Sequence, residues 1–367
     1  CDIAAITAMT CQAARAYELA AAFKRKGAHV VMGGAHPSVR PQEALRHADT
    51  VIAGEAEETW PAFLADFARG RPKRFYAAAR RPAYSFQGSR IPRYDLADIG
   101  RYRAMPVQAG RGCPLGCEFC SVETIHGRNY RHKEVEQVVA EVRFIQRLSP
   151  AGPVRIFFTD DNLLLRRDFL KRLMRALAPL QVSWMAQMDI SVGQDLELLR
   201  LMAESGCGQL LIGFESLDRA NLEALQPSGV KPRMRVEYGR LTQAVQSHGI
   251  RVLGTFMVGL DHDRPGVFRR LRNFIVRHRL HDAHVTIQTP FPGTRLYERL
   301  RSEGRLLEPV DWSRCNFFHA LFKPKHLSER QLLQGHAWLC AAIHHPDVEA
   351  LRLRYWLDYF RRRCAAH

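Results

Sequence analysis

Residues 105–120 read MPVQAGRGCPLGCEFC, a strand-like run that leads directly into a loop with three cysteines. Residues 105–109 are typical of a buried strand, and Cys113, Cys117 and Cys120 follow it closely. This spacing lets three thiolates from one loop converge on a single inorganic centre. A structural zinc site takes four closed ligands, whereas three thiolates leave one position open, which favours an iron–sulfur cluster. A zinc site and three buried thiols are the alternatives.

Beyond this loop, short apolar runs alternate with helical stretches as far as about residue 304. Six strand–helix units in sequence predict a parallel barrel, complete or partial, with its chemistry at the carboxyl ends of the strands. The strands are expected at residues 105–109, 154–159, 182–188, 209–214, 252–258 and 285–289. The helices are expected at residues 133–148, 167–177, 195–204, 236–247, 265–279 and 295–303.

The first 70 residues show the same alternation on a smaller scale, with strands expected at 3–7, 29–32 and 50–53. This pattern predicts an open parallel α/β sheet. Glycines at the carboxyl ends of these strands either let a flat ligand approach the backbone or only end the strands. We expect the chain, which opens on Cys1 in strand-like sequence, to begin inside this domain. The expected divisions are a partial domain at 1–70, a linker at 71–104, the barrel at 105–304 and a mostly helical region at 305–367.

Composition narrows the function classes further. The 367 residues are 46% hydrophobic and 25% charged, which is typical of a globular protein, and no apolar run approaches the roughly 18 residues that span a bilayer. The net charge of +17 is spread along the chain, which favours a solvated surface, with a polyanion-binding face as the alternative. A nucleic-acid partner is not expected. Clustered cysteines without a secretory signal indicate a reducing compartment, and so a cytoplasmic location. No glycine-rich dinucleotide or phosphate-loop motif is present, which excludes the common dehydrogenases and ATPases.

The spacing Cys113-x3-Cys117-x2-Cys120, with Phe119 before the last cysteine, resembles the signature of radical S-adenosylmethionine (SAM) enzymes. Later segments resemble barrel motifs of the subgroup that carries a cobalamin-binding domain, and two early segments resemble the end of that domain. The resemblance covers about residues 2–300. It implies an α/β fold: a partial (β/α)6 radical SAM barrel preceded by a truncated Rossmann-like cobalamin-binding domain, with a helical C-terminal extension. The segments that resemble barrel motifs are residues 157–162, 212–216, 254–259 and 289–294, and those that resemble the end of the cobalamin-binding domain are residues 33–37 and 53–57.

The same resemblance implies cofactors and the residues that hold them. A [4Fe–4S] cluster on the three cysteines would reduce SAM and cleave it to a 5′-deoxyadenosyl radical, while the N-terminal domain would hold cobalamin. The family's usual Gly-Gly-Glu is absent here, so its contact to the amino group of SAM is not carried over. Packing, helix capping and surface roles are the alternatives for these residues, and no further catalytic residue is indicated. The residues implied to bind cofactors are Phe119, Asp161, Glu215, Ser216, Gly34 and His36.

The resemblance therefore implies a radical SAM enzyme, in the first place a cobalamin-dependent methyltransferase or a related enzyme that functionalises C–H bonds. Its partners would be a small-molecule substrate and an electron donor such as flavodoxin or ferredoxin. A cobalamin-free radical SAM enzyme is the first alternative. An RNA methylthiotransferase-like modifier would need a five-stranded C-terminal barrel, whereas the tail after residue 305 has helical character. A non-catalytic iron–sulfur or zinc protein is the last alternative.

Overall fold

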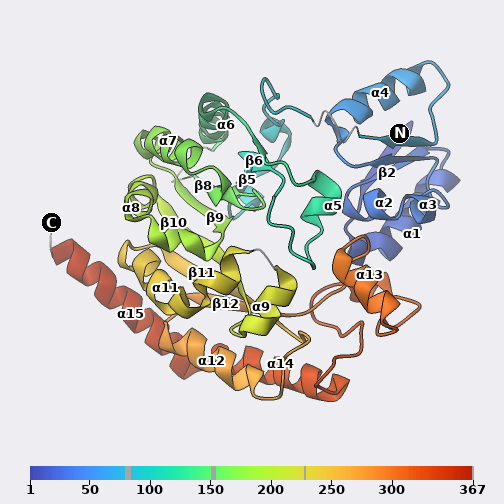
Figure 1. Ribbon diagram of the computed structural model, residues 1–367. Coiled ribbons are helices and arrows are strands. Elements are labelled where there is room, and N and C mark those ends of the chain that lie inside the picture. The colour runs from blue at the N-terminus through green and yellow to red at the C-terminus, as the bar shows by residue number, and fades with distance from the viewer. Residues whose placement is uncertain (79–83, 150–153, 227–228, 366–367) are drawn as a thin grey trace. The chain divides into compact units, whose positions relative to one another are not determined.

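The computed structural model describes residues 1–78, 84–149, 154–226 and 229–365 (Figure 1). Packing divides the chain into two compact units. The first unit comprises Cys1–Ser85, Gly112–Asn129 and Ile287–Pro324, and the second comprises Phe86–Arg111, Tyr130–Thr286 and Lys325–His367. The cysteine loop therefore belongs to the same unit as the N-terminal sheet.

The first unit is built on a four-stranded parallel sheet in the order β1-β2-β3-β4. The three strands expected from the sequence are confirmed to within one residue. A fourth strand lies inside the segment expected to be a linker. It was not foreseen because three residues are too few to show a period of two; its anchor is Tyr76, whose buried ring donates a hydrogen bond to Asp66 at 2.9 Å. The strands are β1 (Ile3–Thr7), β2 (His29–Gly33), β3 (Thr50–Ala53) and β4 (Phe75–Ala77).

Alternate residues of these strands bury against helices on opposite faces of the sheet. Val30 and Met32 of β2 pack in one apolar cluster with Ala16 of α1. Val31, between them, packs in a second cluster with Phe63 of α4. The sheet is thus covered on both faces, as a parallel α/β sheet requires. The helices of the first unit are α1 (Ala13–Arg25), α2 (Ala35–Val39), α3 (Pro41–Ala44), α4 (Ala56–Ala68), α5 (Val122–His126) and α13 (Arg295–Ser302).

The second unit is built on a six-stranded sheet whose spatial order, β5-β8-β9-β10-β11-β12, follows the order in the chain. Neighbouring strands from β5 to β11 pair in parallel. Six strands joined in this way form the partial barrel expected from the sequence. The strands are β5 (Met105–Val107), β8 (Arg155–Phe158), β9 (Ser183–Met188), β10 (Cys207–Glu215), β11 (Arg251–Val258) and β12 (Asp282–Ile287).

Amphipathic helices join these strands. In α7, for example, Phe169, Leu170, Leu173, Met174 and Leu177 are all buried, at the spacing of one helix face. The expected helical tail is confirmed as α14 and α15, and α14 packs on α12. The helices are α6 (Val135–Leu148), α7 (Arg167–Leu177), α8 (Leu196–Glu204), α9 (Arg219–Leu225), α10 (Val230–Met234), α11 (Tyr238–Ser247), α12 (Val267–Arg277), α14 (Glu329–Ile343) and α15 (Pro346–Ala365).

Smaller elements complete the described chain. An antiparallel pair, β6 (Gly110–Arg111) with β7 (Arg131–His132), closes the two ends of the segment that contains the cysteine loop. No helix among the described residues is long and apolar enough to cross a membrane. The 3-10 helices are Thr10–Gln12, Tyr94–Leu96, Ile99–Arg101, Leu163–Leu165, Ala178–Leu180, Ile190–Gln194, Arg235–Glu237 and Trp312–Arg314.

Candidate functional site

The cysteine loop is closed by backbone contacts at its two ends. Gly112 adopts a φ of +94°, and a Cβ at this position would lie 2.3 Å from the carbonyl oxygen of Asn129. The amide of Cys113 donates to the carbonyl of Gly127 at 3.3 Å. Only glycine fits at position 112, because any side chain there would collide with the backbone of Asn129. The two ends of the loop, at Gly112 and Asn129, therefore lie against each other and form a narrow neck.

Inside the loop, a tight turn brings the second and third cysteines together. The amide of Cys120 donates to the carbonyl of Cys117 at 3.1 Å. The side chains of Cys113, Cys117 and Cys120 are half-buried, as is that of Phe119. Half-buried thiols on one short loop are accessible to an inorganic centre and partly shielded from water, which suits ligation by thiolate.

In the second unit, polar side chains tie together the carboxyl ends of neighbouring strands. Asp160, at the end of β8, accepts hydrogen bonds from the amide of Ala109 at 2.9 Å and from the hydroxyl of Tyr130 at 3.3 Å. Asp160 is fully buried, and burial raises its pKa to about 7. The amide of Asn162 donates to Asp189 at 2.9 Å and so joins the ends of β8 and β9.

A second polar network joins the ends of β10 and β11. The carboxylate of Asp263 accepts from the amides of Gly259 and Leu260 and from the side chain of Asn221, at 2.8–3.0 Å. Burial raises the pKa of Asp263 to about 6. Ser216 is buried and accepts from the amide of Asp218 at 3.0 Å, so its hydroxyl oxygen serves the turn after β10.

Glu215 ends β10 in a conformation that non-glycine residues rarely adopt, with a φ of +63°. The pairing of β10 with β11 shifts register at this point. The carboxylate folds back over Gly213, where a Cβ would lie 2.4 Å from its Oε1, and Oε1 accepts from Lys231 at 2.5 Å. Backbone strain, a bulge and a buried ion pair at the carboxyl end of a central strand are features of functional sites.

Asp161 follows Asp160 and is half-buried. It lies near enough to raise the pKa of Asp160 further. Asp161 and Glu215 therefore both stand at carboxyl ends of strands in the same parallel sheet, the edge at which such sheets bind ligands.

In the first unit, the loops after β1 and β2 are joined at the same kind of edge. The amide of His36 donates to the carbonyl of Ala8 at 3.0 Å. Gly34 has a φ of +92°, and a Cβ there would lie 2.8 Å from Thr7 and 3.0 Å from the amide nitrogen of Ala8. Glycine at 34 is thus required for the two loops to approach each other.

The His36 side chain points into the protein. It is fully buried, its Nε2 lies 3.0 Å from the hydroxyl of Tyr17 and 3.6 Å from Glu43, and its ring packs edge-on against Trp312. The indole of Trp312 donates to the same carboxylate of Glu43 at 2.9 Å. Burial lowers the pKa of His36, so its imidazole is held neutral. Its Nδ1 is a buried atom with no hydrogen-bond partner in the structure.

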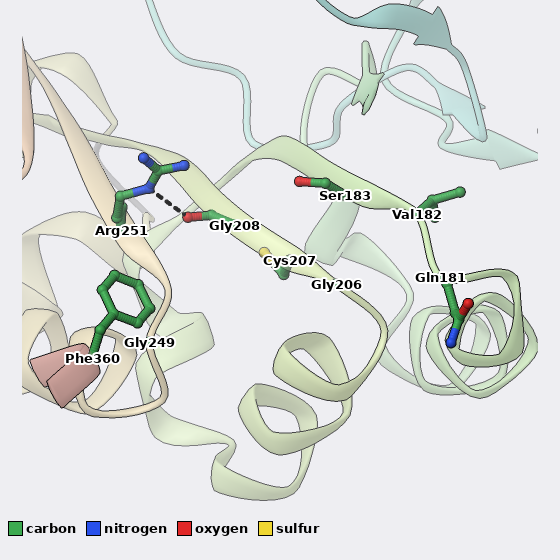
Figure 2. Close-up of a pocket in the computed structure, with 9 residues that line it drawn as sticks. All are labelled: Gln181, Val182, Ser183, Gly206, Cys207, Gly208, Gly249, Arg251 and Phe360. Atoms are coloured by element: carbon green, nitrogen blue, oxygen red, sulfur yellow. Dashed lines mark hydrogen bonds between the residues drawn. The ribbon is translucent and has the colours of Figure 1, made fainter. Parts of the chain in front are cut away.

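A cavity of about 500 Å³ lies at the opposite end of the second sheet (Figure 2). It is lined where β9, β10 and β11 begin, and Arg251 there donates to the carbonyl of Gly208 at 3.1 Å. Burial strongly raises the pKa of Cys207 in this wall, which keeps the thiol protonated. The amino ends of parallel strands serve stability more than catalysis, so this cavity is not the candidate site.

Comparisons with known proteins agree with this arrangement. The Radical SAM superfamily profile matches residues 107–275, and the B12 binding domain profile matches residues 1–64. Bacteriochlorophyllide d C-12(1)-methyltransferase of Chlorobaculum tepidum is 31% identical, over 91% of this chain and 73% of that protein. Bacteriochlorophyllide d C-8(2)-methyltransferase of the same organism is 27% identical, over 88% of this chain and 73% of that protein. The chain belongs to the radical SAM superfamily.

A solved structure of a superfamily member shows the same fold. The radical SAM methyltransferase TsrM from Kitasatospora setae, determined with cobalamin and a [4Fe–4S] cluster bound, superposes with a TM-score of 0.72 at 16% identity, covering 99% of this chain and 87% of that one. The expected fold, a partial radical SAM barrel preceded by a cobalamin-binding-like domain, is confirmed. The cofactors that come with the superfamily are a [4Fe–4S] cluster and SAM.

The cysteine loop of this radical SAM enzyme fits such a cluster. Its donors are three thiols, which suit iron and sulfide. Within the described residues, no three His, Cys, Asp or Glu side chains are grouped as tightly as one metal ion requires. A [4Fe–4S] cluster does not need that grouping, because each of the three thiolates binds a different iron atom.

The edge of the N-terminal sheet also fits a large flat ligand. The loops that follow its strands are built of small residues, and Met9 between them is 59% exposed. Gly34 and Gly54, which follow β2 and β3, both have positive φ. Backbone therefore makes up much of what these loops offer at this edge, and the side chain of His36 is buried inside the unit.

The structure thus groups the expected site residues in three places, two in the first unit and one in the second. Cys113, Cys117, Cys120 and Phe119 share one loop of the first unit, and Gly34 and His36 share another. Asp161, Glu215 and Ser216 stand at strand ends in the second unit. Several residues that contact these side chains, directly or through one another, carry no motif of their own, so no signal in the sequence pointed to them. They are Tyr17, Glu43, Trp312, Lys231, Asn221 and Asp263.

Proposed function

We propose that this enzyme is a cobalamin-dependent radical SAM methyltransferase, which transfers a methyl group from SAM to a carbon atom of a small molecule. The observation that carries the proposal is the B12 binding domain at residues 1–64 in the same chain as the radical SAM domain. The two named relatives are methyltransferases that act on bacteriochlorophyllide d. Their names support a large conjugated ring system as the substrate class.

In this proposal each group of residues has a separate task. Cys113, Cys117 and Cys120 would hold the cluster. After reduction by an external donor such as flavodoxin or ferredoxin, the cluster with SAM would supply a 5′-deoxyadenosyl radical for hydrogen abstraction. Glu215 is proposed to accept a hydrogen bond from SAM through Oε2, because Oε1 is paired with Lys231.

The backbone around Gly34 would support the corrinoid of the proposed methyltransferase. His36 is then a residue that fixes this loop, since its ring is enclosed by Tyr17 and Trp312. Phe119, Asp161 and Ser216 complete the proposed cofactor contacts. Phe119 would pack against the adenine of SAM, and the two polar residues would border the SAM or substrate pocket.

The central test measures methyl transfer with the protein anaerobically reconstituted with iron and sulfide. The protein is mixed with cobalamin, a low-potential reductant and SAM labelled in its methyl group, with and without bacteriochlorophyllide d. We expect S-adenosylhomocysteine and labelled methylcobalamin without the substrate, and 5′-deoxyadenosine from a second SAM in both mixtures. The variant with Ala at positions 113, 117 and 120 is expected to bind no iron and to form no 5′-deoxyadenosine.

Other outcomes separate the alternatives. Formation of 5′-deoxyadenosine without any corrinoid binding would replace the proposal with a cobalamin-free radical SAM enzyme. Uptake of zinc and no iron would overturn the assignment of the cysteine loop. A labelled methyl group on cobalamin but never on the tetrapyrrole would retain the methyltransferase and reject this substrate class.

A second measurement tests Glu215 by SAM affinity. Glu215→Ala is expected to weaken SAM binding by about 1–3 kcal/mol, the usual cost of losing a hydrogen bond to a charged group. The matched control is Glu204→Ala, because Glu204 is half-exposed and pairs with Arg200 one helical turn away. If Glu215→Ala folds and binds SAM with unchanged affinity, Glu215 does not contact SAM, and its role is the structural ion pair with Lys231.

A further inference from the structure

Helix α13 and the turn before it hold the cysteine loop from one side. The hydroxyl of Thr124 donates to the carbonyl of Gly293 at 2.8 Å, next to the start of α13. The amide of Leu296, in the first turn of α13, donates to the carbonyl of Glu118 at 3.1 Å. Arg295 donates to the carbonyl of Gly116. The loop that carries the three cysteines is therefore fixed to residues that lie far along the chain.

The strongest of these contacts joins Glu118 to Arg299. Nε and Nη2 of Arg299 donate to the two carboxylate oxygens of Glu118 at 2.5 and 3.2 Å, in the bidentate geometry that arginine forms with carboxylates. The Glu118 and Arg299 side chains are only 15% and 29% exposed. The pair is thus partly shielded from water and salt, so its charges act more strongly than those of an exposed pair.

Glu118 stands inside the cysteine motif, one residue after Cys117 and two before Cys120. A carboxylate at this place lies within a few residues of every thiolate expected to bind the cluster. Uncompensated negative charge close to an electron acceptor opposes its reduction, because adding an electron adds negative charge. The guanidinium of Arg299 offsets that charge where it arises.

We propose that Arg299 is a positioning residue for the cluster: by pairing with Glu118 it fixes the cysteine loop on α13 and keeps the cluster reducible. The inference rests on the proposed ligation by Cys113, Cys117 and Cys120. It assigns two roles to one ion pair, a mechanical one and an electrostatic one. Substitutions of the two partners separate these roles, since they leave behind charges of opposite sign.

The experiment compares reduction potentials of reconstituted protein, measured by anaerobic redox titration of the cluster spectrum. Arg299→Gln leaves the Glu118 carboxylate without its main partner, and its potential is expected to move to more negative values. Arg299 also pairs with Glu303 at 3.1 Å, so Glu118→Gln leaves the arginine with that carboxylate partner. The local charge still becomes more positive, and the potential is expected to move to more positive values. The double variant is expected to return close to the wild type, because it removes both charges.

Release of iron to a chelator measures the mechanical role. Arg299→Gln, Glu118→Gln and the double variant are all expected to lose iron several-fold faster than the wild type, since each lacks the bidentate contact. Arg299→Lys keeps the charge and loses the bidentate geometry, so it is expected to keep a potential near that of the wild type and to lose iron faster. This variant shows which effect belongs to charge and which to geometry.

Arg301→Gln is the matched control. Arg301 lies on the same helix and its substitution changes the net charge by the same amount, but its side chain is 59% exposed and faces Glu298 and Glu308. We expect neither readout to change in this variant. The inference would be overturned if the reduction potential moved in the same direction in Arg299→Gln and Glu118→Gln. It would also be overturned if the potential changed in neither variant. A wild type that takes up no iron would instead overturn the assignment of the cysteines.

Discussion

Asp160 shows how one buried carboxyl group organises the surroundings of the cysteine loop. It accepts from the amide of Ala109, just before the loop, and from the hydroxyl of Tyr130, just after it. The carboxyl oxygens therefore hold the residue before β6 and the residue before β7. Burial raises the pKa of Asp160 to about 7, so the charge of the group changes near neutral pH.

This raised pKa predicts a pH-dependent stability. A carboxyl group whose pKa is about 7 in the folded protein and 3.8 when unfolded binds more protons in the folded state between these values. Its contribution to stability is therefore complete below pH 3.8 and is lost as the pH rises through about 7, at up to about 1.4 kcal/mol per pH unit. Asp160→Asn is expected to remove this slope, which urea unfolding of variant and wild type from pH 5 to pH 8 would detect.

Asp263 provides the comparison for this experiment. Burial raises the pKa of Asp263 to about 6, so its contribution makes the unfolding free energy fall with pH only up to about pH 6. Asp263→Asn should remove this dependence. If the difference in unfolding free energy between wild type and Asp160→Asn is flat from pH 5 to pH 8, Asp160 does not titrate in this range.

At the scale of elements, the cysteine loop depends on the glycine at its neck. Gly112→Ala combines a positive φ with a Cβ that would lie 2.3 Å from the carbonyl oxygen of Asn129, so the neck must open. We expect this variant to lose most of its iron on reconstitution. Gly127→Ala is the matched control, since Gly127 also has a positive φ, +77°, but nothing lies within 4 Å of the added carbon. Iron and sulfide assays of both proteins test the comparison, and equal losses would show that backbone strain alone is responsible.

The elements themselves were largely predictable from sequence, because a period of two or 3.6 is a local property. The expected strand at 252–258 corresponds to β11, and that at 209–214 to the middle of β10. The last expected strand, 285–289, begins three residues earlier as β12. Its first residues, Asp282-Ala283-His284, alternate between the two faces of the sheet but include only one apolar side chain, which obscured the start.

Contacts between elements were not predictable in the same way. Arg299 and Glu118 are separated by 181 residues, and nothing in either neighbourhood marks the other. Lys231 lies only 16 residues from Glu215, yet a lysine on a short helix reads as a solvated charge until the fold buries it. The sequence indicated the chemistry of the cysteine loop through its spacing. The residues that hold the loop depend on packing, which periodicity does not encode.

At the scale of the whole molecule, sequence order and packing divide the chain differently. The expected barrel at 105–304 is continuous in sequence, and this division stays a prediction. Packing instead assigns residues 112–129 and 287–324 to the unit that contains the N-terminal sheet. Contacts such as that between Thr124 and Gly293 account for this assignment, because they join the cysteine loop to the segment around α13.

This division predicts where binding of the cluster stabilises the protein. A ligand that binds only the folded state stabilises the cooperative unit that holds it, and regions outside that unit respond less. Cluster loading is therefore expected to slow amide hydrogen exchange in residues 112–129, in α13 and in the strands of the first sheet. Peptides from β9 and β10, which lie in the second unit, should exchange at nearly the same rate with and without the cluster.

Hydrogen exchange measured by mass spectrometry on cluster-loaded and cluster-free protein makes the comparison directly. The variant with Ala at the three cysteines, treated in the same way, controls for effects of iron and sulfide on the rest of the chain. Equal protection in β10 and in β2 on loading would mean that the two units open as one cooperative block. Protection confined to residues 112–129 would mean that the loop opens on its own, and that its contacts to α13 break before either sheet does. Slowed exchange throughout the first unit alone is the result that the packing of the loop requires.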